Sequence, residues 1–134
     1  MQKALIVYGT KTGTAAVTAQ EIAQALQNKG VETKVVDAKK EKIRSITEYD
    51  LIIVGSGIQI GCWNSEPENF IKKYKQELAK KNLALYVNCG SAAEKLNPEK
   101  PEIAANAKTK YLDEKAAKYN LKPVALGFFG AIYN

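Results

Sequence analysis

The most informative part of this chain is Leu5-Ile6-Val7-Tyr8-Gly9-Thr10-Lys11-Thr12-Gly13-Thr14. A short apolar run, typical of a buried strand, gives way there to glycines and hydroxyl residues. The following residues carry apolar side chains at helical spacing: Ala15, Ala19, Ile22, Ala23 and Leu26. A strand, a tight loop and a helix N-terminus in succession place backbone amides and the positive end of the helix dipole at one spot. The hydroxyls of Thr10, Thr12 and Thr14 add donors, so the stretch predicts a site for a phosphate group.

The composition is that of one globular domain. With 134 residues, 46% of them hydrophobic and 25% charged, the chain can bury a single core, so we expect residues 1–134 to form one domain. No apolar run approaches membrane-spanning length and a strand pattern follows Lys3 directly, so we expect no integral membrane segment and no signal peptide. Two cysteines, Cys62 and Cys89, favour a reducing cytoplasm. The lack of histidine excludes a Ser-His-Asp triad and histidine-ligated metals.

The chain is basic, with a formal net charge of +6 at pH 7. Such a charge suits nucleic acid, an anionic membrane surface or an acidic partner. Many of the lysines surround the apolar positions of one expected helix, which favours a solvated helix face. No motif interleaves basic and aromatic residues in the manner of an RNA-binding sheet, so we expect no nucleic acid partner.

Strand and helix patterns alternate along the chain. The expected strands are Ala4–Tyr8, Val31–Asp37, Leu51–Val54, Leu83–Val87 and Val124–Phe129. The expected helices are Ala15–Lys29, Glu66–Lys80 and Glu102–Tyr119, with loops at 55–65 and 88–101, a weakly patterned stretch at 38–49, and Gly30 as a helix cap. Apolar strands joined by helical crossovers predict an α/β fold, a five-stranded parallel sheet in a three-layer α/β/α sandwich. The common strand order is 2-1-3-4-5, with ligands bound at the carboxyl ends of the strands.

The loops at that end resemble those of the flavodoxin family, which shares this topology. The family's phosphate loop is a hydroxyl residue, any residue, Thr, Gly, any residue and a second hydroxyl residue. Residues 10–14 fit the first five places, while Ala15 holds the sixth. The missing hydroxyl should weaken phosphate binding by about 1 kcal/mol, and Lys11 offers a compensating charge. The resemblance covers essentially the whole chain and implies bound FMN; the alternative is a strand-to-helix turn that binds nothing.

Two further loops match segments that line the flavin ring in this family. The segment 55–63 resembles the first, and its glycines let the backbone approach a ring closely; its candidate residues are Ser56, Gly57, Ile58, Gln59, Gly61 and Trp63. The Trp63 ring either stacks on the flavin or packs in the core. The second segment is Asn88-Cys89-Gly90-Ser91. The tyrosine that many flavodoxins carry a few residues later is absent, which implies a more open flavin.

The segment 55–70 resembles the menaquinone-dependent protoporphyrinogen oxidase branch of the superfamily, as does Gly127-Phe128-Phe129-Gly130-Ala131. The resemblance implies an FMN-binding redox protein that carries electrons to a redox partner. The alternatives are an FMN-dependent oxidoreductase of the protoporphyrinogen oxidase type, acting on a quinone or another small molecule, and a cofactor-free binding module. No catalytic residue and no metal ligand is assigned. A receiver domain is excluded because the strand ending in Tyr8-Gly9-Thr10 carries no carboxylates for magnesium.

Two features depart from the family. Few carboxylates lie near the flavin loops, so we expect a higher reduction potential than in acidic flavodoxins. After Val124–Phe129 the fold expects a last helix beside the first one, but only residues 130–134 follow. With this helix missing, the sheet would expose an apolar face. We expect a second copy or another chain to cover that face, or the sequence to be a shortened form of a longer domain.

Overall fold

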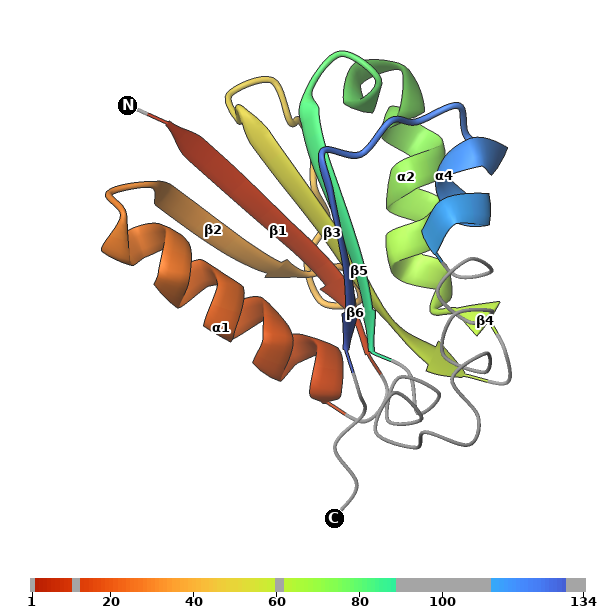
Figure 1. The fold of residues 1–134 in the computed structure, drawn as a ribbon, viewed down its shortest axis with the longest axis horizontal. Helices are drawn as coiled ribbons and strands as arrows, with labels where there is room; N and C mark the ends of the chain where they lie inside the picture. The colour runs from red at the N-terminus through yellow and green to blue at the C-terminus, as the bar shows by residue number, and fades with distance from the viewer. Residues whose placement is uncertain (1, 11–12, 60–61, 89–111, 130–134) are drawn as a thin grey trace, which may run out of the picture.

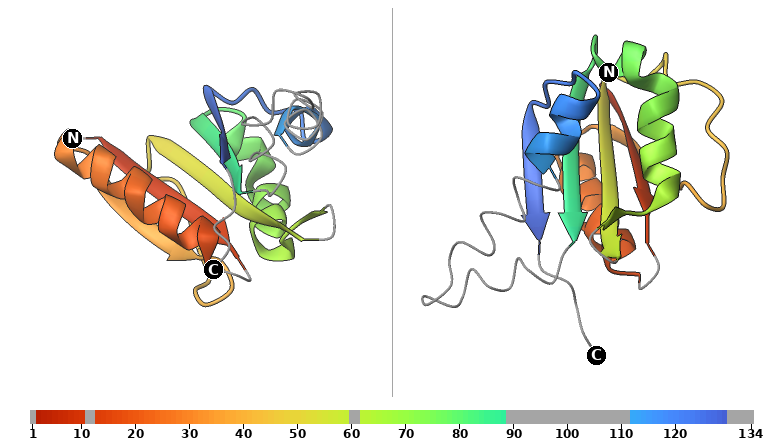
Figure 2. Two further views of the ribbon diagram at one scale, coloured as in Figure 1. Left: turned by 60° about the horizontal axis from the view of Figure 1, so that its bottom comes forward. Right: turned by 90° about the vertical axis from the view of Figure 1, so that its right-hand side faces the viewer.

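The computed structural model describes residues 2–10, 13–59, 62–88 and 112–129. Its centre is a sheet of parallel strands in the order β2-β1-β3-β5-β6. The strands are β1 (Lys3–Gly9), β2 (Glu32–Asp37), β3 (Leu51–Gln59), β5 (Asn82–Asn88) and β6 (Ala125–Phe129). Helices lie on both faces of this sheet (Figure 1; Figure 2). The predicted α/β sandwich and its 2-1-3-4-5 strand order are therefore confirmed.

Helix α1 (Thr14–Asn28) packs on one face of the sheet, mainly over β1 and β2 (Figure 1). Its stripe of Ala15, Ala19 and Ala23 is buried, and it packs on a cluster that includes Ile53 and Tyr86. Such small side chains let the helix lie close to the strands. The helix ends at Asn28 with Lys29 as its C-cap, and Gly30 follows with φ +82°, a left-handed conformation that favours glycine after a helix.

Helices α2 (Ser65–Leu78) and α4 (Glu114–Lys118) cover the opposite face (Figure 2). Helix α2 buries Phe70, Ile71, Tyr74 and Leu78, which recur at the spacing of one helical face. The larger core cluster forms there, joined by Leu112 and Ala116 from the α4 region. Because successive strand side chains point to opposite faces, the strands contribute alternate residues to the two clusters.

The third strand is longer than predicted. The expected loop 55–65 is wrong over its first part, since β3 continues to Gln59 and then pairs antiparallel with the short strand β4 (Cys62–Trp63). Pairing continues because Gly55, Ser56 and Gly57 stay in register with Tyr86, Val87 and Asn88 of β5. The Tyr86 ring fills the space where a side chain at Gly55 would lie. Glycine at position 55 therefore allows the Tyr86 ring to pack closely, and it does not interrupt the strand.

Other element boundaries differ in smaller ways. The stretch 38–49 forms turns, with Ile46 buried in the larger core cluster. Of the helix expected at Glu102–Tyr119, only residues from 112 onward lie in the described part of the chain, where α4 occupies Glu114–Lys118. In that described part, no helix is long and apolar enough to cross a membrane.

The face beside α1 is open over β3, β5 and β6. A groove of about 350 Å³ lies there, lined by Ile22 of α1 and by apolar residues of these strands and the preceding Val124. Leu126 is 36% exposed and Val124 is 64% exposed. Among the described residues, no second helix lies beside α1 over this part of the face (Figure 2).

Candidate functional site

Three strands end side by side at one edge of the sheet. The arrows of β1, β3 and β5 point to the same end of the molecule (Figure 1). In register, Gly9 of β1 lies opposite Ser56 of β3, and Gly57 lies opposite Asn88 of β5. A Cβ added to Gly57 would lie 3.9 Å from the hydroxyl oxygen of Thr10. Thr10, Gly57 and Asn88, predicted from three separate segments, therefore lie at the same edge of the sheet.

The loop after β1 leads directly into helix α1. The Gly13 amide donates a hydrogen bond of 2.9 Å to the Thr10 hydroxyl oxygen, which folds the loop back on itself. Gly13 has φ +89°, which glycine adopts at little cost, and it occupies the N-cap position without a side chain to cap the helix. The Val17 amide makes the first helical bond, 3.2 Å to the Gly13 carbonyl. The amides of the first turn therefore have no acceptor within the helix, which suits an anion.

Asn88 has a buried oxygen atom without a hydrogen-bond partner. Its side-chain amide nitrogen donates to the Thr18 hydroxyl at 2.9 Å, so the side chain lies on the α1 face of the sheet. Its Oδ1 atom is the one buried side-chain oxygen or nitrogen of the described residues that no donor satisfies. Buried acceptors are normally satisfied, and an orphan is costly. A donor on a bound ligand would satisfy it.

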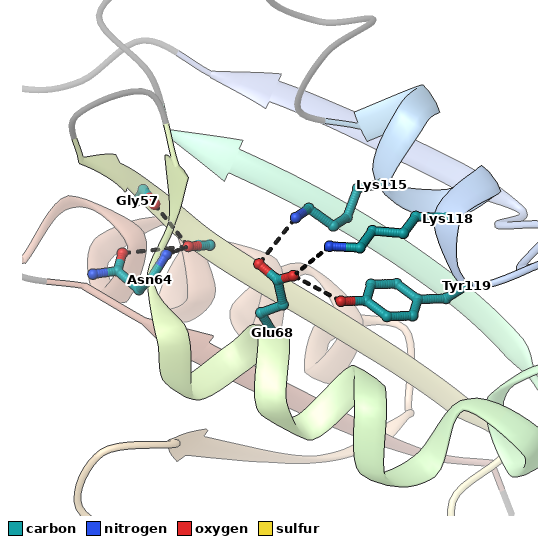
Figure 3. Close-up of polar contacts among 7 residues, drawn as sticks. Gly57, Asn64, Glu68, Lys115, Lys118 and Tyr119 are labelled. Carbon is teal, nitrogen blue, oxygen red and sulfur yellow. Dashed lines mark hydrogen bonds and ion pairs between the residues drawn. The ribbon is translucent and has the colours of Figure 1, made fainter.

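The end of β3 is tied to the start of α2 by a buried hydroxyl (Figure 3). The Ser56 hydroxyl donates to the Gly57 carbonyl at 2.7 Å and accepts from the Asn64 amide at 2.8 Å. Ser56 is fully buried, and Asn64 is 6% exposed. Asn64 is a site residue that the sequence reasoning did not single out. The sequence signal for Asn64 is an asparagine at the N-cap position, directly before the helix start Ser65-Glu66-Pro67.

Trp63 lies in the core. Its side chain is 6% exposed and belongs to the larger core cluster, and the Lys115 ammonium lies 5.8 Å from its ring centroid. Of the two interpretations that the sequence left open for Trp63, this placement favours core packing over stacking on a ligand.

A carboxylate on α2 holds helix α4 beside the sheet (Figure 3). Glu68 accepts from the Lys115 ammonium at 2.9 Å and from the Tyr119 hydroxyl at 2.7 Å, and the Lys118 ammonium lies 3.5 Å away. Burial acts to raise the pKa of Glu68, but the hydrogen bonds from Tyr119 and Lys115 and the lysine charges outweigh it and lower the pKa to about 2. Burial and the Glu68 carboxylate raise the pKa of Tyr119.

Several predicted residues lie outside the described part of the chain. These are Lys11, Thr12, Gly61, Cys89, Gly90 and Ser91, so their places in the site stay predictions. Thr14 and Ala15 are buried at the start of α1, and Ile58 is half-buried near the end of β3. Within the described residues, no cluster of three metal-ligating side chains occurs.

A protein-family model matches residues 5–133 of this chain and is described as a flavodoxin domain. The chain belongs to the flavodoxin family. Among curated proteins, it is 26% identical over 84 residues to the protoporphyrinogen IX dehydrogenase [quinone] of Escherichia coli strain K12. That match covers 63% of this chain and 46% of the relative, so this flavodoxin-family chain spans about half the length of the curated relative.

Solved flavodoxins share the fold. A short-chain flavodoxin associated with a non-canonical PDU bacterial microcompartment superposes with a TM-score of 0.71 at 17% identity, covering 100% of this chain and 88% of the other. Oxidised flavodoxin 1 from Bacillus cereus gives a TM-score of 0.67 at 21% identity, covering 99% of this chain and 87% of the other. The fold of the described residues is therefore that of the solved flavodoxins.

FMN is the cofactor that membership of the flavodoxin family implies, and the described residues fit it. The first turn of α1, which follows a glycine at the N-cap, presents the N-terminal end of a helix to a phosphate group. The orphan oxygen of Asn88 is an acceptor for which the ring N–H and the ribityl hydroxyls of FMN are matching donors. Gly57 carries no Cβ beside the Thr10 hydroxyl, which favours a close approach of a planar ring to its backbone.

Proposed function

We propose that this chain binds FMN non-covalently and carries electrons to and from a redox partner. The observation that carries the proposal is the orphan Asn88 oxygen, buried beside the α1 helix in a chain of the flavodoxin family. An unsatisfied acceptor at the carboxyl edge of the sheet is costly unless a ligand uses it. FMN has a phosphate for the helix end and donors for Asn88, so one ligand accounts for both features.

The residues of the chain bind and orient the cofactor. The first-turn amides of α1 and the hydroxyls of Thr10, Thr12 and Thr14 hold the phosphate, aided by Lys11 and limited by Ala15. Two segments line the flavin ring. One edge of the ring lies against Ser56, Gly57, Ile58, Gln59 and Gly61, and the other lies against Asn88, Cys89, Gly90 and Ser91. The bound flavin supplies the electron transfer, and the protein supplies binding, orientation and electrostatics.

A second candidate is an FMN-dependent oxidoreductase that acts with a quinone. It is favoured by the 26% identity to a protoporphyrinogen IX dehydrogenase [quinone] and by the +6 net charge, which suits a substrate bearing carboxylates. Steady-state oxidation of a carboxylated porphyrinogen, coupled to quinone reduction, distinguishes the two. An electron carrier should give no turnover in that assay, although its flavin should exchange electrons with a reductase.

We also propose where the protein is located and how it assembles. Two cysteines with no disulfide framework favour a reducing compartment such as the cytoplasm. The apolar groove over β3, β5 and β6 favours an interface with a second copy of this chain. The remaining alternative, a cofactor-free binding module, predicts protein that takes up no flavin.

The variant Asn88→Ala tests the proposal against a matched control, Asn82→Ala, at the exposed start of the same strand. We expect Asn88→Ala to weaken FMN binding by roughly tenfold, the value of one or two hydrogen bonds, and Asn82→Ala to leave it unchanged. The measurement is quenching of flavin fluorescence on titration of apoprotein. Equal affinities in all three proteins would count against the role of Asn88, and no binding to any of them would reject the function.

A further inference from the structure

We infer that the groove between helices α2 and α4 is a docking site for an acidic segment of a partner protein. The two helices lie side by side on one face of the sheet (Figure 1; Figure 2), and a groove of about 230 Å³ runs between their C-terminal ends. We call it the lysine groove, and its lining residues are Lys75, Gln76, Ala79, Lys118, Tyr119 and Asn120. None of these residues belongs to the FMN site, so the inference goes beyond the proposed function.

Two lysines stand on the two walls of this groove. Lys75 comes from the last turn of α2, and Lys118 is the last residue of α4. Lys75 forms no ion pair with any other residue that the structure describes. The Lys118 ammonium lies 3.5 Å from Glu68, but its side chain stays 59% exposed. A carboxylate that enters from solvent therefore meets two cations, and the side-chain amides of Gln76 and Asn120 are further donors.

The nearby Glu68 carboxylate does not neutralise the groove. Its oxygens already accept from the Lys115 ammonium at 2.9 Å and the Tyr119 hydroxyl at 2.7 Å (Figure 3). The side chains of Glu68 and Lys115 are only 17% and 15% exposed, so these two opposite charges form an inner pair. The charge of Lys118 is then left over for an anion on the solvent side.

The charged residues of α2 are sorted by side. Lys72 and Lys75 are three residues apart, so they share one side of the helix, and Lys75 places that side at the groove. Glu77 follows Lys75 by two positions, which puts it on the opposite side. Glu66 lies about three turns before Glu77 and shares its side. The side of α2 that faces α4 is therefore basic, and these two carboxylates point away from it.

The other helical layer differs in charge. Helix α1 carries a single charged residue, Glu21, over its whole length, whereas exposed lysines extend the basic surface around the groove at Lys73, Lys80 and Lys122. Lysines that only served solubility would not need to gather on one layer. A second copy carries the same net charge of +6 and is repelled at this surface. A protein segment rich in carboxylates is complementary to it.

The test measures binding of a short, fluorescently labelled poly-glutamate peptide to the apoprotein by anisotropy. Lys72→Gln and Lys75→Gln each remove one charge at the groove. Lys29→Gln is the matched control, because it removes one charge at the exposed C-cap of α1. Chemical shifts of backbone amides locate the bound peptide. Phosphatidylglycerol vesicles and single-stranded DNA are tested beside the peptide, since both also offer anionic groups.

We expect the peptide to bind at an ionic strength of about 0.01 M and much more weakly at about 0.15 M, as the Debye length falls from about 30 Å to about 8 Å. Lys72→Gln and Lys75→Gln should each weaken binding by roughly two- to fivefold, the value of one exposed ion pair, and Lys29→Gln should leave it unchanged. The bound peptide should shift the amides of Gln76 and Asn120.

Three results would overturn the inference. They are equal weakening by all three variants, no peptide binding at low ionic strength, and tighter binding of the vesicles or the DNA than of the peptide. The apoprotein is used throughout, so each of these results leaves the proposed function standing. Absence of FMN binding would reject the proposed function and leave the lysine groove unaffected.

Discussion

The Tyr86 hydroxyl donates a hydrogen bond of 2.8 Å to the carbonyl of Ala15, at the start of helix α1. The Tyr86 ring lies over Gly55 of the neighbouring strand, in the space that a Cβ would need. Burial raises the pKa of this hydroxyl, so it stays a donor at any ordinary pH. One buried side chain therefore joins β3, β5 and the first turn of α1, next to the candidate phosphate loop.

We expect Tyr86→Phe to lower the free energy of unfolding by about 1 kcal/mol, since it removes one buried hydrogen bond and keeps the ring. Gly55→Ala should cost more, about 1–3 kcal/mol, because its new methyl group overlaps the ring. Urea unfolding of the apoprotein measures both. A Gly55→Ala variant as stable as the wild type would show that the ring does not hold this position.

We expect the free energy of unfolding to depend on pH through the Glu68 carboxylate. A folded pKa of about 2, below the usual 4.5, means that the stabilisation is present above about pH 4.5 and is lost as the pH falls toward 2. Glu68→Gln should lower the free energy of unfolding by about 1–2 kcal/mol at pH 7 and remove part of this acid dependence. Thermal unfolding between pH 2 and pH 7 provides the measurement.

Glu41→Gln is the matched control for Glu68→Gln. The Glu41 carboxylate lies 3.1 Å from the Lys34 ammonium, but both side chains are more than half exposed. Exposed pairs contribute about 0–1 kcal/mol, so the control should change stability little. Equal effects of the two substitutions would contradict the account of the Glu68 cluster.

Substitutions at Gly13 and Gly30 distinguish the effect of backbone strain on stability from an effect on ligand binding. They have φ +89° and +82°, so Gly13→Ala and Gly30→Ala should each lower stability by about 1 kcal/mol. Gly13 lies in the phosphate loop, whereas Gly30 lies at the far end of α1. Gly13→Ala should therefore also weaken FMN binding, and Gly30→Ala should not. Parallel thermal melts and FMN titrations measure this, and equal affinities would count against the phosphate site.

We expect a charged residue in the apolar groove over β3, β5 and β6 to change the oligomeric state. If a second copy covers the groove, Leu126→Lys should shift the protein to the monomer in light scattering. Val17→Lys, at an apolar position of α1 that is 46% exposed and does not line the groove, should leave the assembly unchanged. A wild-type protein that is monomeric at high concentration would reject the interface.

The sequence predicted the fold where local patterns and topology agree. The apolar strands, the alanine stripe of α1 and the glycine after it all specify one parallel sheet. The extension of β3 was missed because its glycines indicate a loop when read locally, whereas the Tyr86 ring that requires Gly55 comes from another strand. The Ser56–Asn64 bridge and the orphan Asn88 oxygen likewise depend on residues far apart in sequence, so no local pattern specifies them.

Titration of the apoprotein with FMN and with riboflavin tests the central claim most directly. Riboflavin has the same ring and ribityl chain but no phosphate, so its affinity isolates the contribution of the loop at residues 10–14. We expect saturable one-to-one quenching of FMN fluorescence and markedly weaker binding of riboflavin. A folded protein that leaves FMN fluorescence unchanged, or binds both ligands equally, would contradict a phosphate site at the start of α1.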